Sequence, residues 1–250
     1  MNSLKSNVEW QLWGKADPLW SVSSWPGKQK GSPTAWTDEE FYRVGESDWR
    51  DFFRQWQQYG VETRDCLEIG CGAGRITRQL GRTFDHVFGV DVSADMIERA
   101  AKAVGDNVEF AVIDGIHLPY ADSSVSAVFS THVFQHLDNV NIGYEYLREI
   151  FRVLRPGGTL MLHLPLYEWP TSQRGLFLRF LVAIYAVRCR MAKTHADVRR
   201  FCRIKTMRGT NYPITPLYRF LCALGYRNIE FRVFPTTSNG DLHSFVLASK

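Results

Sequence analysis

A glycine-rich stretch between an expected strand and an expected helix places the strongest constraint on the fold. Residues 66–69 end a short apolar run typical of a buried strand, and residues 75–80 have the spacing of a helix. Gly70, Gly72 and Gly74 lie between them at alternate positions. Glycine tolerates backbone angles that a β-carbon forbids and lets a ligand lie against the main chain, and the free N–H groups at a helix start attract such a ligand. We therefore expect a ligand-binding turn from strand to helix; a turn without a ligand is the alternative.

The spacing of these glycines discriminates between two classes of cofactor-binding turn. A dinucleotide fingerprint reads G-x-G-x-x-G, whereas here Arg75 occupies the place of the third glycine, which comes one position early. Glu68 precedes the first glycine by two positions, so the stretch reads E-x-G-x-G-x-G. Asp91 ends the next apolar run, where a carboxylate can accept hydrogen bonds from both hydroxyls of a ribose. The spacing disfavours a nicotinamide-dependent oxidoreductase, which remains as an alternative.

Short apolar strands alternate with helical segments through the middle of the chain. Strands are expected at residues 66–69, 86–90, 108–113, 125–130 and 159–164, and helices at 38–59, 75–80, 93–104 and 147–154. Thr37 and Glu40 have the spacing of a capping box before the first helix. The last part of the chain predicts a helix at 215–224 and two strands at 227–234 and 242–249. The alternation predicts a parallel sheet with helices on both faces, and the short final connection predicts an antiparallel hairpin.

The ordered set of these motifs resembles the class I S-adenosylmethionine-dependent methyltransferases of the small-molecule type (methyltransferase type 11-like). The motifs that carry the resemblance are Glu68-x-Gly70-x-Gly72-x-Gly74, Asp91-x-Ser93, Asp114, Leu118-Pro119 and Leu154-Arg-Pro-Gly-Gly158. The resemblance is close over residues 61–165 and loose over residues 215–250. It implies an α/β fold with a Rossmann-like seven-stranded methyltransferase sheet, in which parallel strands are closed by an antiparallel hairpin, with an N-terminal arm and a helical cap insertion.

The chain is expected to divide into four segments. They are an aromatic-rich arm and helix at 1–60 that forms a lid, a cofactor-binding core at 61–165, a basic helical cap insertion at 166–214, and a helix and hairpin at 215–250 that complete the core. Seven of the eight tryptophans lie in the first 60 residues. Prolines and glycines within residues 1–36 predict an irregular arm that packs by burying its rings; rings that line the acceptor pocket are the alternative.

The resemblance implies that S-adenosyl-L-methionine is the cofactor and S-adenosyl-L-homocysteine the product. It places Asp91 at the ribose, Met96 at the adenine ring and Asp114 at the adenine amino group. It also places Arg43, from the helix upstream of the core, at the carboxylate of the methionine end. The complete expected cofactor-binding set is Glu68, Gly70, Cys71, Gly72, Gly74, Arg75, Asp91, Val92, Met96, Asp114, Gly115, Ile116, Thr131 and Arg43. An ordinary core role for Met96 and a solvated surface role for Arg43 are the alternatives.

The resemblance also implies direct in-line transfer of a methyl group to an oxygen, nitrogen or carbon nucleophile of a small molecule. A hydroxyl acceptor benefits from a general base, and His132, His136 and His163 are the catalytic candidates, with structural hydrogen bonding as the alternative. The spacing of His132 and His136 suits two metal ligands on one helix, but no third ligand is apparent, so no metal is expected. Residues 130–134 read STHVF in place of an N-P-P-Y-like loop, which disfavours adenine and glutamine acceptors. A non-catalytic S-adenosylmethionine-binding protein is the alternative.

The insertion combines an excess of basic residues with an apolar stretch. Residues 174–208 contain ten basic side chains and one acidic one, although the net charge of the whole chain is only +4. Residues 175–187 are apolar nearly all round, which predicts a helix that is buried, forms a homodimer contact, or touches a membrane surface. The arginines suit an anionic partner, so a methyltransferase of lipids or anionic macromolecules is a further alternative. No helix-turn-helix, RNA-binding signature or zinc finger indicates nucleic acid.

The composition favours a globular protein of a reducing compartment. Hydrophobic residues make up 45% of the chain and charged residues 22%, which is ordinary for a soluble domain. No apolar run reaches the roughly 18 residues of a membrane span, and the first residues lack an apolar signal core. Five cysteines, odd in number and without C-x-x-C spacing, predict free thiols. We therefore expect a cytoplasmic enzyme whose acceptor is a small molecule, aromatic or anionic.

Overall fold

The computed structural model describes residues 4–168 and 209–250. The predictions for the basic run at 174–208 and for its apolar stretch at 175–187 lie outside the described residues. Within the two described ranges, no helix is both long enough and apolar enough to cross a membrane.

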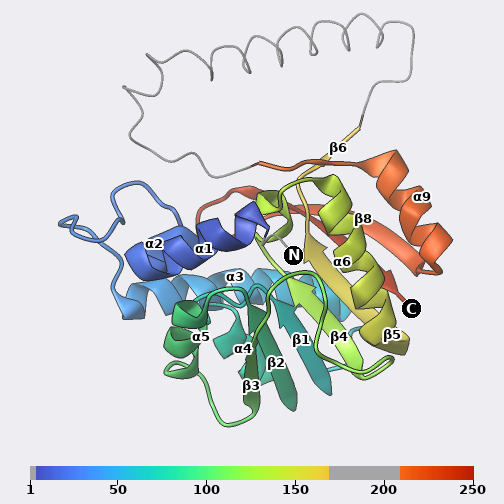
Figure 1. Ribbon diagram of the computed structural model, residues 1–250, viewed down its shortest axis with the longest axis horizontal. Helices are drawn as coiled ribbons and strands as arrows, with labels where there is room; N and C mark the ends of the chain where they lie inside the picture. Colours follow the sequence, from blue (N-terminus) through green and yellow to red (C-terminus); the bar gives the residue numbers. More distant parts are fainter. Residues whose placement is uncertain (1–3, 169–208) are drawn as a thin grey trace, which may run out of the picture.

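A seven-stranded sheet forms the centre of the molecule (Figure 1). Its strands, from one edge to the other, are β3 (Val108–Val112), β2 (His86–Asp91), β1 (Asp65–Ile69), β4 (Val125–Ser130), β5 (Leu154–His163), β9 (Leu242–Ser249) and β8 (Arg227–Pro235). Neighbouring strands from β3 to β5 are parallel, whereas β9 is antiparallel to both β5 and β8. A separate parallel pair consists of β6 (Leu166–Tyr167) and β7 (Tyr212–Pro213). The predicted parallel sheet closed by an antiparallel hairpin is confirmed.

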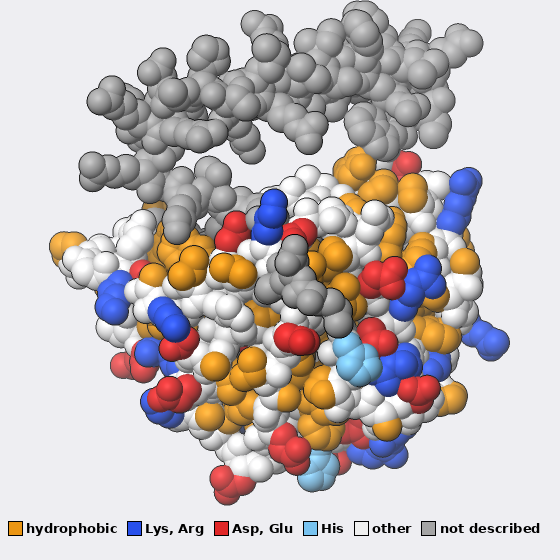
Figure 2. All heavy atoms as spheres, in the orientation of Figure 1, with side chains coloured by type: hydrophobic (Ala, Val, Ile, Leu, Met, Phe, Trp, Pro, Cys, Tyr) orange, Lys and Arg blue, Asp and Glu red, His pale blue; other side chains and the backbone are white. Residues whose placement is uncertain are grey.

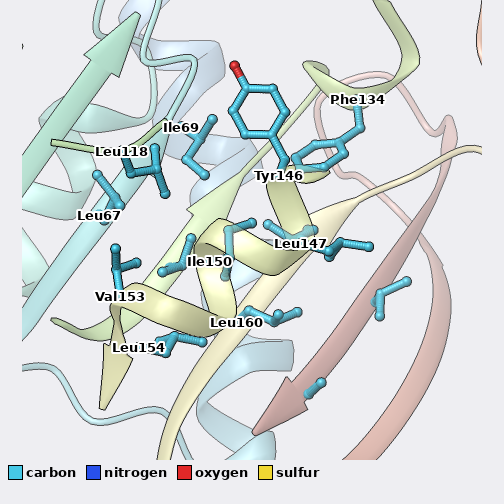
Figure 3. Packing of buried hydrophobic residues seen from close by; sticks show 14 of the residues in the cluster. Leu67, Ile69, Leu118, Phe134, Tyr146, Leu147, Ile150, Val153, Leu154 and Leu160 are labelled. Atoms are coloured by element: carbon cyan, nitrogen blue, oxygen red, sulfur yellow. The ribbon is translucent and has the colours of Figure 1, made fainter. Parts of the chain in front are cut away.

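Helices cover both faces of this sheet and one end of its strands (Figure 1). They are α1 (Lys5–Ala16), α2 (Pro18–Val22), α3 (Asp38–Tyr59), α4 (Thr77–Thr83), α5 (Ala94–Ala101), the 3-10 helix η1 (Phe134–His136), α6 (Val140–Val153) and α9 (Ile214–Leu224). Because both faces are covered, successive strand residues are buried in opposite cores. On one face, Leu147 and Ile150 of α6 pack with Leu67 and Leu160 of the sheet (Figure 3).

Helix α3 anchors the opposite face. The predicted capping box is confirmed, because Thr37 Oγ1 accepts a hydrogen bond from the Glu40 N–H (3.2 Å) and the Glu40 carboxylate accepts one from the Thr37 N–H (3.4 Å). Phe52 and Trp56 are fully buried against the sheet, and burial of such a ring stabilises the fold by about 1.5–3 kcal/mol. The Trp56 indole N–H also donates to Thr159 Oγ1 of β5 (3.1 Å). These contacts fix α3 relative to the strand ends.

The N-terminal arm is more regular than predicted. The expectation of an irregular arm is wrong for residues 5–22, which form α1 and α2, and confirmed for residues 23–36, which contain neither helix nor strand. Pro18 begins α2 instead of interrupting a helix, because proline is tolerated at the first helical position. Asp17 caps that helix by accepting a hydrogen bond from the Trp20 N–H (3.3 Å).

Several element boundaries within the core also differ from those predicted. The structure begins α4 at Thr77 instead of Arg75, ends α5 at Ala101 instead of Val104, begins α6 at Val140 instead of Leu147, and begins β5 at Leu154 instead of Thr159. The Asn139 side chain caps α6 early by accepting hydrogen bonds from two backbone N–H groups. The early start of β5 accompanies a register shift against β4, between Val125 and Ala127, so a segment expected as a turn still pairs.

Candidate active site

A cavity of about 660 Å³ lies where the strand order reverses, between β1 and β4. In parallel α/β sheets, ligands bind beyond the carboxyl ends of the strands at such a switch point. The cavity is lined by the loop after β1, the ends of β2 and β5, residues 131–137 after β4, and the hairpin segment 236–244. Residues of α1 and of segment 21–25 line a further side. Its volume is within the range of about 300–1,000 Å³ that is usual for small-ligand sites.

The glycine loop needs its glycines for two physical reasons. Gly70, Gly72 and Gly74 have φ values of 75°, 52° and 80°, a left-handed region that side chains disfavour. A β-carbon on Gly70 would also lie 2.1 Å from Val133 Cγ2, and one on Gly74 would lie 3.0 Å from Ala100 Cβ. Gly70 and Gly72 line the cavity. The loop therefore presents bare main chain to a ligand.

Asp91, at the end of β2, faces the same cavity. Its two carboxylate oxygens accept hydrogen bonds from the Gly72 N–H (2.8 Å) and the Ser93 N–H (2.9 Å). Burial raises the pKa of this carboxyl, and the backbone hydrogen bonds oppose that rise. Each oxygen retains acceptor capacity for the hydroxyls of a ribose. The bare loop and this carboxylate together fit a nucleoside.

Three expected cofactor residues stand apart from the cavity lining. Glu68, Cys71 and Gly74 are buried in or beside the glycine loop, and none belongs to the set of described residues that line the cavity. Burial raises the pKa of Glu68 to about 8, although the nearby Arg75 charge opposes the rise. Among the described residues, Glu68 Oε2 has no hydrogen-bond partner. These three residues support the loop and do not face the cavity.

The arginine that reaches the cavity is Arg75 and not Arg43. Arg43 lies on the exposed side of α3, outside the described cavity lining, which corrects its expected position at the methionine end. Arg75 is 4% exposed, lines the cavity, and forms an ion pair with Asp48 of α3. Gly45 permits this approach, because a β-carbon there would lie 2.5 Å from the Arg75 carbonyl oxygen. The helix phase explains the difference, since Gly45 and Asp48 face inward and Arg43 does not.

The expected adenine end is apolar. Met96, Val92 and Ile113 line the cavity there, and Ile113 is an addition that its place at the end of β3 could have indicated. Asp114 is exposed, and together with Gly115 and Ile116 it falls outside the described cavity lining. Two side chains that line the cavity donate hydrogen bonds to this segment instead. Asn7 Nδ2 donates to the Asp114 carbonyl oxygen (2.9 Å), and the Tyr146 hydroxyl donates to the Gly115 carbonyl oxygen (3.0 Å).

Helix α1 lies over the cavity and is held by specific hydrogen bonds. The Asp138 carboxylate accepts hydrogen bonds from the backbone N–H groups of Lys5 (3.0 Å) and Ser6 (2.9 Å). Gln11 Nε2 donates to the Val92 carbonyl oxygen (3.1 Å) beside Asp91. The arm therefore contacts both the β2 end and the segment after β4. Sequence reasoning did not identify these contacts, because they join positions more than 80 residues apart.

Three histidines meet on the β5–β9 side of the cavity. His132 follows β4, His163 ends β5 and His243 lies in β9, and all three line the cavity. Their ring centroids are separated by 4.6 Å (His132–His163), 5.2 Å (His132–His243) and 5.3 Å (His163–His243). His243 was not among the expected site residues. The pairing of β9 with β5 brings His243 beside His163, and the predicted hairpin alone, which pairs β9 with β8, did not indicate it.

All three rings are neutral near pH 7. Burial lowers the pKa of His163 to about 3 and lowers that of His132 well below its usual range, with the neighbouring His163 and Arg75 as further causes for His132. Burial also lowers the pKa of His243, and the charge of Asp48 opposes this. Neutral imidazoles present a lone pair that can accept a proton or bind a metal ion.

His136 and Thr131 also line the cavity. The His136 ring lies 5.2 Å from the ring of Trp10, and its Nε2 lies 2.9 Å from Gln135 Nε2. His132 and His136 therefore do not form the pair of ligands on one helix that their spacing allowed. The structure brings His132 to His163 and His243 and places His136 under α1.

Comparisons with known proteins agree with this fold and site. Residues 67–162 match the family model described as a methyltransferase domain. "Methyltransferase GfsG" of Streptomyces halstedii is 36% identical over 100 residues, 38% of this chain and 35% of that protein. "27-O-demethylrifamycin SV methyltransferase" of Amycolatopsis mediterranei is 36% identical over 102 residues, 38% of this chain and 36% of that protein. The matched part therefore spans about a third of the length of these relatives.

A solved S-adenosylmethionine-dependent methyltransferase from Methanosarcina mazei superposes with a TM-score of 0.58 at 21% identity, covering 77% of this chain and 95% of that one. The sheet order and the cavity at its switch point define the class I, Rossmann-like methyltransferase fold. The described fold is therefore that of the class I S-adenosylmethionine-dependent methyltransferases, and residues 67–162 match the model of a methyltransferase domain. The resemblance inferred from the sequence motifs is thereby confirmed.

Proposed function

We propose that the chain transfers a methyl group from S-adenosyl-L-methionine directly to an oxygen, nitrogen or carbon atom of a small molecule. The observation that carries this proposal is the pairing of the bare glycine loop with the Asp91 carboxylate at the switch point of the sheet. When bound, the cofactor supplies an activated methyl group on a sulfonium sulfur. The residues of this chain have only to bind, orient and shield it, together with its acceptor.

Three groups of residues in the cofactor half of the cavity would each contact a different part of the cofactor. Asp91 would accept the ribose hydroxyls, and Met96 with Ile113 would contact the adenine ring. Arg75, held by Asp48, would face the methionine end. The expected in-line geometry then depends on rigid placement of the cofactor and the acceptor, which can lower the activation barrier by up to about 7–11 kcal/mol.

The acceptor half is assigned to the side where the three histidines lie. A neutral imidazole there can accept a hydrogen bond from an acceptor hydroxyl and orient it. Because burial lowers the pKa of His132 and His163, these rings are weaker general bases than one whose pKa lies near the operating pH. His132 is the first choice for this role because it directly follows β4, beside the glycine loop, while His163 and His136 are the next candidates. Catalysis by a histidine predicts that the reaction is not lost by protonation in mildly acidic buffer, since burial keeps these rings neutral.

A small-molecule acceptor is favoured over a polymer. The cavity volume of about 660 Å³ holds a nucleoside cofactor and one compact acceptor. Acidic and basic side chains are interspersed over the face of the described residues in Figure 2, so that face lacks a continuous basic track. The relative from Amycolatopsis mediterranei is named for a small-molecule acceptor, demethylrifamycin. An aromatic acceptor suits the tryptophans that line the cavity, Trp10 and Trp25.

The test begins with cofactor binding by calorimetry, using S-adenosylmethionine and S-adenosylhomocysteine with the full chain. Asp91→Ala removes the charged acceptor of two hydrogen bonds donated by the ribose hydroxyls, each worth about 1.5–3 kcal/mol, so we expect the dissociation constant to rise by at least about 100-fold. Asp106→Ala, at an exposed site, serves as the matched control and should bind normally. The absence of a binding signal in the unmodified chain would refute the proposal.

Acceptor identity is tested separately with a cofactor carrying a labelled methyl group and a panel of phenols, macrolide-like alcohols and amines. Transfer of label to a small molecule is expected. Cofactor binding without transfer to any acceptor class would instead favour the alternative of a non-catalytic cofactor-binding protein.

A further inference from the structure

The three-histidine cluster, His132, His163 and His243, has the composition of a metal site. Each residue offers one ring nitrogen, and these nitrogens lie within 4.8 Å of one another. A tetrahedral zinc ion with Zn–N bonds of about 2.0–2.1 Å holds its ligand nitrogens roughly 3.3 Å apart. Side-chain rotations that bring each nitrogen inward by about an ångström would close the cluster around an ion.

One nitrogen of the cluster lacks a partner. His163 is 6% exposed, and its Nδ1 has no hydrogen-bond partner within the part of the chain that the structure describes. An unpaired buried polar atom destabilises the fold, because its hydrogen bond to water is lost without replacement. A metal ion bound at either nitrogen of this ring would offset that cost, by occupying Nδ1 or by reorienting the ring.

The backbone at His132 gives independent support. His132 has a φ of 60°, which is a left-handed conformation adopted by few residues other than glycine. Such strain is maintained only where the surrounding structure imposes it, and it concentrates at ligand sites. Here it directs the residue after β4 towards the ends of β5 and β9 instead of continuing the strand.

The local charges are compatible with a cation. Within the part of the chain that the structure describes, the Arg75 charge acts on His132, and this guanidinium forms an ion pair with Asp48. Asp241, on the hairpin turn, lines the same cavity and contributes a negative charge near His243.

We propose that His132, His163 and His243 bind one divalent transition metal ion, with zinc as the best match to three imidazoles. Three protein ligands with a fourth position open to a cavity is the arrangement of catalytic zinc sites. A fourth position open to the cavity would suit an acceptor that bears a hydroxyl group, whose pKa the ion would lower. The ion would then replace the hydrogen-bond-accepting role proposed above for His132 and His163, because their lone pairs would be bound to the metal. This catalytic role rests on the proposed methyl transfer, whereas metal binding itself does not.

The test is a metal titration of the full chain after removal of bound metal with a chelator. Cobalt(II) serves as the spectroscopic probe, and zinc is then added in competition. We expect one equivalent of cobalt with the visible absorption of a tetrahedral site, displaced by zinc. His163→Gln and His243→Gln should each weaken binding by more than about 100-fold, since loss of an outer-shell partner alone costs about 10–100-fold. His86→Gln, at an exposed position at the start of β2, is the matched control and should bind as the unmodified chain does.

Circular dichroism and S-adenosylhomocysteine binding are recorded for every variant, so that a folding defect is recognised. Should His163→Gln fail to fold, the half-buried His243→Gln still decides the question. The proposal is overturned if the unmodified chain binds no stoichiometric cobalt, or if both variants bind it as tightly as the control. Either result can occur with normal S-adenosylhomocysteine binding, which would leave the proposed methyl transfer standing.

Discussion

The buried carboxyl of Glu68 makes the stability of this protein depend on pH in an unusual direction. Burial raises its pKa from 4.5 to about 8, so the folded chain retains a proton that the unfolded chain has released. Stability rises with pH only where the unfolded state binds more protons. Between about pH 4.5 and 8 the folded state binds more, and the contribution of Glu68 to stability therefore falls as pH increases.

The size of this effect follows from the difference between the two pKa values. At 1.36 kcal/mol per unit, the destabilisation reaches about 3 kcal/mol at pH 7 and about 4 kcal/mol at pH 8, where the folded-state carboxyl is half ionised. Replacing Glu68 with glutamine keeps the shape and removes the ionisation. We expect Glu68→Gln to match the unmodified chain near pH 5 and to be more stable by several kcal/mol at pH 8.

The measurement is urea-induced unfolding followed by circular dichroism at pH 5, 6, 7 and 8, with linear extrapolation of the free energy of unfolding. Glu109→Gln, on the exposed side of β3, is the control and should follow the unmodified chain at every pH. The histidine cluster titrates equally in all three proteins, so its contribution cancels in the differences. Parallel pH curves for Glu68→Gln and the unmodified chain would refute the assignment of a neutral Glu68.

Two further substitutions test the packing that supports the site. Gly70→Ala should lower the melting temperature and abolish S-adenosylhomocysteine binding, because the new β-carbon would lie 2.1 Å from Val133 Cγ2 at a φ of 75°. Exposed Gly105, where a β-carbon would make only an ordinary contact of 3.5 Å with Asn107 Oδ1, provides the control Gly105→Ala. Equal binding by both variants would contradict the reasoning. Trp56→Phe should reduce the free energy of unfolding by about 1–3 kcal/mol, since it leaves the Thr159 hydroxyl without its indole donor. Urea-induced unfolding at neutral pH measures this free energy, and an unchanged free energy of unfolding would argue against the hydrogen bond.

The parts of the fold that sequence reasoning captured are those with local causes. The glycine loop consists of neighbouring residues whose positive φ angles favour glycine. The capping box joins Thr37 and Glu40, which are three positions apart. The antiparallel hairpin at 227–249 follows from two alternating runs and a short connection. In each case the physical determinant and the structure that it determines lie in the same short segment.

The parts that were missed depend on long-range contacts or on helix phase. His243 joins His163 only because β9 pairs with β5, a contact across about 80 residues. Proline was expected to prevent a long helix in the arm, and α1 and α2 are indeed separate, but the place of Pro18 after Asp17 also makes it a helix start. Arg43 was placed by resemblance, although the burial of Phe41, Tyr42 and Gly45 on α3 turns it towards solvent.

The two ends of the cavity come from different parts of the chain, and we expect them to differ in how well they tolerate substitutions and insertions. Residues 68–96 shape the end next to β2, whereas the turn between β8 and β9 contributes the opposite wall and has an exposed tip around Gly240. Exposed turn tips accept insertions and substitutions at little cost to the fold. Substitutions or insertions in this hairpin turn can therefore reshape one wall of the cavity without altering the glycine loop at its other end.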